Sequence, residues 1–259
     1  MQHLNLEKSI RYLSARFLIL FLLIAALGFV NSSHAASFVE KRYEMVTEQL
    51  ETRDIIDKRV LAAMNWIPRH LFVPKTVSDH AYEDRSLPIG WEQTISQPYI
   101  VALMSQAAQV SSEDRILEIG TGSGYQAAVL GLLGKEVYTI EIVEPLGLGA
   151  RKVLKDLGHK NVHVRIGDGN LGWPEHAPFD VILVTAEADE IPQALLDQLN
   201  ENGCLIMPVG THHSQNLVRV TKKNGEFISE TLSAVRFVPL INGPNSYTTA
   251  TVQVFPKKN

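Results

Sequence analysis

After residue 114 this sequence alternates short apolar runs with longer amphipathic segments, and this alternation limits the possible folds more than any other feature. Five runs rich in β-branched residues indicate strands, and the segments between them suit helices. The expected strands are 115–119, 136–142, 162–166, 179–184 and 203–208, and the expected helices are 125–133, 145–157 and 191–200. We therefore expect an α/β fold: a doubly wound, Rossmann-like parallel sheet with helices on both faces.

The segment before this sheet has a helical pattern. Between residues 37 and 65 the apolar residues Ile56, Val60 and Met64 recur at helical spacing, which predicts an N-terminal helical preface. Residues 82–97 are rich in turn formers and aromatics and show no clear period. We expect them to form a loop-rich segment that lies across the domain.

A helix and a hairpin complete the expected fold. Pro98 stands at a favoured first-turn position and opens a helix before the first strand of the sheet. Near the other end, residues 217–221 and 226–231 flank the turn sequence Lys222-Lys223-Asn224-Gly225. This pattern predicts an antiparallel hairpin that extends the sheet.

Composition narrows the class of protein. A chain of 259 residues with 45% hydrophobic content can bury one good core, so we expect a single domain over residues 37–259. The net charge of −4 and the lack of long Lys/Arg clusters disfavour a nucleic-acid partner. The one cysteine, Cys204, lies in an apolar run and predicts an inert core thiol. Nine histidines without metal-ligand spacing predict no bound metal.

The first 36 residues have the composition of a leader. Basic residues within the first 16 positions precede the apolar run 17–30, and the small, polar stretch 31–37 follows. This order is typical of a secretory signal, with cleavage expected after Ala35. The apolar run is shorter than the roughly 20 residues of a membrane span, so an uncleaved anchor is the second interpretation and a buried core helix the third.

Three glycines mark the turn after the first strand of the expected sheet. Gly120, Gly122 and Gly124 permit a tight turn and let the backbone approach a ligand closely. A dinucleotide fingerprint requires glycine where this chain has Tyr125, and the turn lacks the lysine of a phosphate-binding P-loop. A ligand with a pyrophosphate group is therefore disfavoured.

Three acidic residues follow or end strands of the expected sheet. Glu141 ends the second strand, where an acid can accept hydrogen bonds from ribose hydroxyls, and Asp168 follows the third. With Glu118 they surround one crevice, which suits a nucleoside with a cationic sulfonium better than a polyphosphate. The alternatives are a solvated carboxylate at a strand end for Glu141 and an ordinary Asp-Gly turn for Asp168.

Seven ordered segments carry a resemblance to a known family. They are 81–84 (AYED), 87–90 (LPIG), 93–98 (QTISQP), 118–126 (EIGTGSGYQ), 167–169 (GDG), 177–180 (APFD) and 235–239 (VRFVP). Together they resemble the bacterial protein-L-isoaspartate O-methyltransferases from about Met45 to Leu240. Asn170 and the acidic stretch Glu187-Ala188-Asp189 depart from the family's usual residues, and we expect both to bear on substrate preference.

The resemblance implies methyl transfer from S-adenosyl-L-methionine to the α-carboxylate of L-isoaspartyl residues in damaged proteins and peptides. The methyl ester formed initiates repair through a succinimide. The family's active-site serine corresponds to Ser96. The implied cofactor-binding residues are Glu118, Gly120, Thr121, Gly122, Gly124, Glu141, Asp168 and Gly169, and the implied substrate-binding residues are Thr94, Ile95, Ser96, Val235 and Phe237.

The chemistry fits this small set of residues. An ionised carboxylate is already a competent nucleophile at neutral pH, so no general base is required. Ser96 needs only to donate a hydrogen bond, and the N-terminus of the helix opened by Pro98 favours a bound carboxylate. The alternative is that Ser96 only caps that helix.

Other functions and locations remain open from the sequence. One alternative is a carboxyl methyltransferase for another substrate, and another is an exported binding protein that has lost catalysis. The leader indicates a periplasmic or inner-membrane-tethered protein, with membrane contact only if it stays uncleaved. Because the cofactor is made in the cytoplasm, initiation at Met45 is the alternative that gives a leaderless cytoplasmic form.

Overall fold

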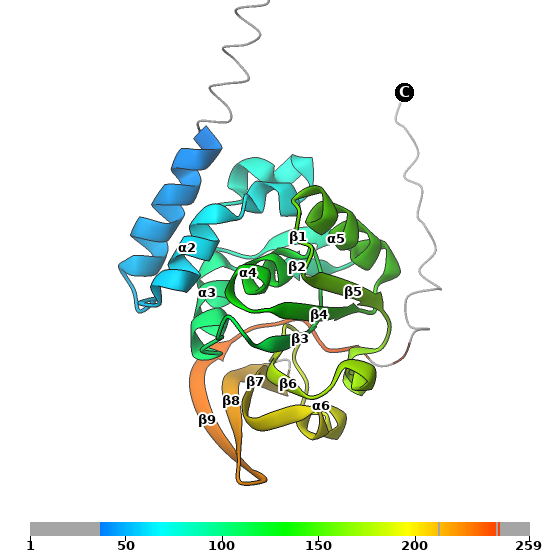
Figure 1. Cartoon of the computed structure of the whole chain (residues 1–259). Coiled ribbons are helices and arrows are strands. Elements are labelled where there is room, and N and C mark those ends of the chain that lie inside the picture. Colours follow the sequence, from blue (N-terminus) through cyan, green and yellow to red (C-terminus); the bar gives the residue numbers. More distant parts are fainter. Residues whose placement is uncertain (1–36, 212, 242, 244–259) are drawn as a thin grey trace, which may run out of the picture. The chain divides into compact units, whose positions relative to one another are not determined.

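The computed structural model describes residues 37–211, 213–241 and 243, and its central element is a seven-stranded sheet (Figure 1). The strand order is β5-β4-β3-β6-β7-β8-β9. The strands are β3 (Arg115–Ile119), β4 (Glu136–Glu141), β5 (Val162–Ile166), β6 (Phe179–Val184), β7 (Leu199–Thr211), β8 (Ser214–Lys223) and β9 (Glu226–Val235). The expected leader, residues 1–36, lies outside the described residues.

The topology confirms the predicted doubly wound sheet. Strands β3 to β7 pair in parallel, whereas β8 and β9 are antiparallel and form the predicted hairpin. The chain runs outward from β3 to β4 and β5, then returns to the other side of β3 with β6. The carboxyl ends of β3 and β6 therefore flank a switch point, where open α/β sheets bind ligands.

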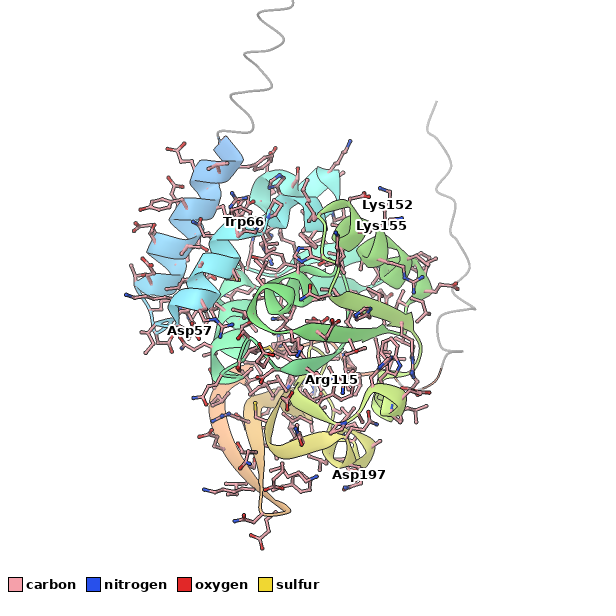
Figure 2. The ribbon with its side chains drawn as sticks, in the orientation of Figure 1. Asp57, Trp66, Arg115, Lys152, Lys155 and Asp197 are labelled. Atoms are coloured by element: carbon pink, nitrogen blue, oxygen red, sulfur yellow. The ribbon has the colours of Figure 1, made fainter. Side chains whose placement is uncertain are left out.

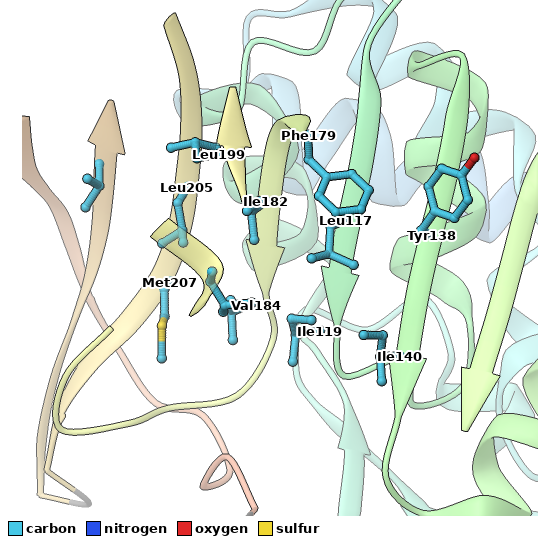
Figure 3. Close-up of a cluster of buried hydrophobic side chains, with 12 residues drawn as sticks. Leu117, Ile119, Tyr138, Ile140, Phe179, Ile182, Val184, Leu199, Leu205 and Met207 are labelled. Carbon is cyan, nitrogen blue, oxygen red and sulfur yellow. The ribbon is translucent and has the colours of Figure 1, made fainter. Parts of the chain in front are cut away.

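Helices cover both faces of this sheet. The helices around it are α3 (Pro98–Ala107), α4 (Tyr125–Leu133), α5 (Glu144–Asp156) and α6 (Gln193–Asp197). On one face Leu117 and Ile119 of β3 belong to a fully buried cluster with Ile182 and Leu205, and α6 adds Leu195 (Figure 3). Helix α4 contacts β4 and β5. Burial on both faces explains why β3 carries apolar residues on both, at Ile116, Leu117 and Ile119.

The helical preface is broken into two parts, which corrects one expectation. Helical residues run from 37 to 51, the last seven (η1, Met45–Glu51) with π-helical geometry, and α2 (Lys58–Trp66) follows after an interruption. Asp57 caps α2 by accepting hydrogen bonds from the backbone N–H groups of Arg59 and Val60 (Figure 2). Ile56 precedes this cap and is 81% exposed, so it does not share the buried face of Val60.

The segment expected to be a loop contains a short hairpin instead. Strands β1 (Leu87–Gly90) and β2 (Gln93–Ile95) pair antiparallel, with Leu87 opposite Ile95. Trp91 and Glu92 form the turn with φ of 55° and 58°. Two-residue hairpin turns of this type usually carry Asn-Gly or Asp-Gly, so the Trp-Glu pair concealed the hairpin.

Other details agree with or refine the sequence analysis. Cys204 is buried and free, and its Sγ lies 3.3 Å from the carbonyl oxygen of Ala108, as expected of an inert core thiol. Helix α6 is shorter and β7 longer than expected. Within the described residues, no helix is long and apolar enough to cross a membrane.

Candidate active site

The three glycines form a turn that only glycine adopts without strain. Gly120, Gly122 and Gly124 have φ of +93°, +52° and +89°, in the region that side chains with a Cβ rarely enter. The Gly120 N–H donates to the carbonyl of Ile140 at 2.9 Å, which joins the turn to β4. The turn therefore brings bare backbone to the carboxyl edge of the sheet, directly before α4.

A cavity opens beside this turn. It encloses about 550 Å³ of empty space, including the open solvent at its mouth. Its lining residues are Gln93, Thr94, Ile119, Gly120, Gly122, Ile140, Glu141, Ile142, Val143, Gly169, Thr185, Ala186, Val238, Pro239, Leu240 and Ile241. Glu141 is the one ionisable side chain in this described lining. A cavity with apolar walls, one carboxylate and no lining cation suits a nucleoside and disfavours a polyphosphate.

Glu141 is held rigidly at the end of β4. Its Oε2 accepts the Gly122 N–H at 2.6 Å, and its Oε1 accepts the Val143 N–H at 2.9 Å. Burial raises the pKa of Glu141, and these backbone hydrogen bonds oppose that rise. Each carboxylate oxygen keeps a second lone pair for a ligand hydroxyl.

Glu118 lies beneath the turn and is not among the described residues that line the cavity. It is fully buried, and its Oε2 accepts the hydroxyl of Thr139, which is 2.6 Å from the hydroxyl of Thr121. Burial raises the pKa of Glu118 to about 8, so its carboxyl group is mostly neutral at pH 7. Glu118 therefore stabilises the backbone beneath the glycine turn and does not reach the cavity.

Asp168 accepts hydrogen bonds from neighbouring protein groups in this structure. Its Oδ1 accepts from the backbone N–H and the side-chain amide of Asn170, both at 2.9 Å, and its Oδ2 accepts the Gly243 N–H at 3.1 Å. Gly169 lines the cavity, whereas Asp168 and Gly124 are absent from the described lining. Asp168 thus shapes the loop that closes one side of the cavity.

A second, larger groove adjoins this cavity and contains most of the expected substrate residues. It is lined by Ser86, Thr94, Ser96, Gln97, Ile100, Thr185, Ala234, Val235, Arg236, Phe237, Val238 and Pro239. Ile95 and Thr121 line a smaller cavity between Ser96 and the glycine turn. The cap position of α3 is Gln97, and no side chain bonds to that helix end. Helix capping is therefore not the role of Ser96.

Two threonines connect the three spaces. Thr94 and Thr185 line the cavity beside the glycine turn, the groove and the small cavity between them. Thr185 follows β6, and its hydroxyl donates to the carbonyls of Ile119 and Gly120 at 3.0 and 2.7 Å. Sequence reasoning missed Thr185, although a polar residue directly after a buried strand at the switch point is a signal of a site residue.

The two departures from the family's usual residues lie beside these spaces. The Glu187 N–H donates to the Val238 carbonyl at 2.8 Å, and the Leu240 N–H donates to the Glu187 carbonyl at 2.7 Å. The side chain of Asn170 donates to the Ile241 carbonyl at 3.3 Å. Both residues therefore hold the segment 238–241, which lines the cavity.

Comparisons with known proteins agree with this geometry. The family model described as protein-L-isoaspartate(D-aspartate) O-methyltransferase matches residues 40–245. A protein-L-isoaspartate O-methyltransferase of Opitutus terrae is 56% identical over 221 residues, which are 84% of this chain and 95% of that protein. Protein-L-isoaspartate O-methyltransferase 2 of Shewanella sediminis is 50% identical over 230 residues, which are 86% and 94% of the two chains.

A solved structure extends the likeness to three dimensions. A Plasmodium falciparum protein described as an isoaspartate O-methyltransferase, in complex with S-adenosyl-L-homocysteine, is 28% identical with a TM-score of 0.68. The match covers 77% of this chain and 98% of that one. On the family match, the identities and the shared fold, this chain belongs to the protein-L-isoaspartate(D-aspartate) O-methyltransferase family.

Proposed function

We propose that this chain transfers the methyl group of S-adenosyl-L-methionine to the free α-carboxylate of L-isoaspartyl residues in damaged proteins. The methyl ester formed initiates repair through a succinimide. The observation that carries the proposal is the junction at Thr94 and Thr185, where the cavity lined by Glu141 and the glycine turn meets a groove that contains Ser96. Family membership supports the choice of substrate.

The lining of the cavity fits S-adenosyl-L-methionine. Glu141 has lone pairs left for ribose hydroxyls, and the glycine turn offers bare backbone. Among the described lining residues there is no lysine or arginine to repel the cationic sulfur. When bound, the cofactor supplies a methyl group that passes to a carboxylate oxygen as the sulfur–carbon bond breaks and S-adenosylhomocysteine leaves. We assign its binding to Gly120, Gly122, Glu141 and Gly169.

The residues of the groove orient the carboxylate. Ser96 donates a hydrogen bond to it, and the positive end of the ten-residue helix α3 begins two residues later at Pro98. Val235 and Phe237 provide apolar walls that exclude water. The carboxylate is already ionised at neutral pH, so catalysis rests on proximity and orientation rather than on a general base.

The test compares an isoaspartyl peptide with its normal aspartyl twin, each incubated with methyl-labelled S-adenosyl-L-methionine. We expect label only in the isoaspartyl peptide. The substitution Ser96→Ala should lower kcat/KM about 10- to 100-fold, because a hydrogen bond to a charged group contributes about 1.5–3 kcal/mol. Calorimetry should show cofactor binding unchanged.

Ser111→Ala is the matched control, because Ser111 is exposed and lies outside both spaces. It should retain wild-type turnover. Equal labelling of both peptides would instead indicate a carboxyl methyltransferase with another substrate. Absence of cofactor binding by the wild-type protein would indicate a binding protein that has lost catalysis.

We also propose that residues 1–36 export the chain to the periplasm, either as a cleaved signal or as a tether to the inner membrane. The order of basic, apolar and small residues in the leader supports export. An exported enzyme requires a supply of cofactor outside the cytoplasm. The alternative is a cytoplasmic form that starts at Met45, and the N-terminal sequence of the protein in each cell fraction distinguishes the two.

A further inference from the structure

Arg69 lies fully buried next to the backbone of Ser96. It begins the short helix η2 (Arg69–Phe72). Its Nη2 donates to the Ser96 carbonyl and its Nε to the Ala81 carbonyl, both at 2.7 Å. Its guanidinium lies 4.7 Å from the ring centroid of Tyr125, the first residue of α4 after the glycine turn. One side chain thus joins the Ser96 segment to the cofactor turn.

Arg69 forms no ion pair with any of the described residues. None of the eight ion pairs found there includes it, and its Nη1 is buried without a hydrogen-bond partner. Burial lowers the pKa of Arg69 to about 10, so it stays cationic at neutral pH. The titratable groups that face it are Tyr125, Tyr82 and Asp84, and Asp84 already pairs with Arg53 at 3.1 Å.

A buried cation that forms no ion pair is costly, and the cost falls when an anion comes near. Ser96 and Tyr125, both in contact with Arg69, line the same small cavity between the groove and the turn. Arg236 is the cation in the described lining of the groove, and its side chain is exposed. Arg69 is therefore the buried source of positive potential beside Ser96.

We propose that Arg69 is a positioning residue: it fixes the Ser96 segment against Tyr125, and its unpaired charge favours a carboxylate over a neutral group in the groove. This inference rests on the proposed function, because it assumes that the methyl acceptor is an anion. It also explains why the chain keeps a charged side chain where an apolar one would cost less to bury.

The test uses an isoaspartyl peptide and a twin in which the α-carboxylate is a carboxamide. Binding of both peptides to the S-adenosylhomocysteine-loaded full chain is measured by calorimetry, and kcat and KM are measured with the carboxylate peptide. The variants are Arg69→Met, Arg69→Lys and the control Arg115→Met. Arg115, labelled in Figure 2, also lies over a tyrosine ring, Tyr138 at 5.6 Å. It begins β3, whereas the glycine turn follows the end of that strand.

Arg69→Met should lose at least tenfold of the preference for carboxylate over carboxamide and at least tenfold in kcat. Arg69→Lys keeps the charge but cannot bridge both carbonyls, so it should keep most of the preference while kcat falls. Arg115→Met should match wild type in both.

Several results would overturn the role of Arg69. Melting temperature and S-adenosylhomocysteine binding show whether the Arg69→Met protein is folded. If it is folded and its kcat and its preference for the carboxylate peptide are unchanged, Arg69 is not a positioning residue. If Arg69→Met does not fold, an unchanged kcat in Arg69→Lys overturns it equally. A wild-type protein that methylates no isoaspartyl peptide refutes the proposed function instead, so the two failures are distinct.

Discussion

At the scale of single residues, Glu118 links the cofactor turn to pH. Its carboxyl group is neutral in the folded protein up to a pKa of about 8, because burial is the main cause of the shift and the nearby Glu141 adds to it. In the unfolded chain the same group ionises near 4.5. As pH rises from about 4.5 to 8, the unfolded chain releases the proton of Glu118 while the folded chain retains it. The free energy of unfolding therefore declines over this pH range.

We predict that Glu118→Gln removes this pH dependence. The amide stays neutral and still offers an oxygen to the Thr139 hydroxyl. Each unit by which the folded and unfolded pKa values of Glu118 differ corresponds to about 1.36 kcal/mol of stability. Between pH 5 and 8.5, the free energy of unfolding measured in urea should therefore fall by a few kcal/mol more in wild type than in the variant. Glu113→Gln is the control, because Glu113 is exposed and paired with Lys135. Parallel pH profiles for wild type and Glu118→Gln would show that Glu118 is ionised in the fold.

At the scale of elements, the glycine turn is the least replaceable part of the fold. A Cβ on Gly120 would collide with the hydroxyl of Thr185, which holds the carbonyls of Ile119 and Gly120 itself. Gly120→Ala should therefore lower the free energy of unfolding by about 1–3 kcal/mol and weaken cofactor binding at least tenfold. Urea unfolding and calorimetry measure the two effects.

Gly149 provides the opposite case within the same chain. It lies in α5, is exposed, and a Cβ there would meet no atom within 4 Å. Gly149→Ala should raise the free energy of unfolding by about 0.5–1 kcal/mol and leave cofactor binding unchanged, because alanine stabilises a helix interior. Equal effects of the two substitutions would mean that the turn tolerates a Cβ.

The elements also show how far the sequence could lead. The expected bounds of β3, β5, β6 and α4 match the structure, because buried β-branched runs and a glycine turn leave few other conformations. The β1–β2 hairpin was not predicted from the sequence, because its turn uses Trp91 and Glu92 instead of the usual turn residues. Its strands are also too short to show an alternation of apolar and polar residues.

The site was predictable to a similar degree. Glycines and strand-end acids located the crevice, but sequence spacing cannot show whether an acid faces a ligand or supports the backbone. Glu141 lines the cavity, whereas Glu118 and Asp168 bond to neighbouring protein groups. Arg69 gave no signal, because its partners are carbonyl groups 12 and 27 positions away in the sequence.

At the scale of the whole molecule, the structure helps to distinguish a protein that begins at Ala36 from one that begins at Met45. Met45 begins η1 and is 0% exposed. A chain that starts at Met45 carries a charged amino group on a buried residue, which is unfavourable. We therefore expect the 45–259 chain to unfold at a lower temperature than the 36–259 chain.

Thermal unfolding of the two purified chains, with and without S-adenosylhomocysteine, measures this difference. Ligand at 100 times its Kd should add about 2.7 kcal/mol to either chain that still binds it, so the difference should persist when both are saturated. In cells, the protein of the periplasmic fraction should begin at Ala36, after cleavage behind Ala35. Recovery of a stable protein that begins at Met45, in the cytoplasmic fraction alone, would contradict both expectations, because one start excludes the other within a single pool of protein.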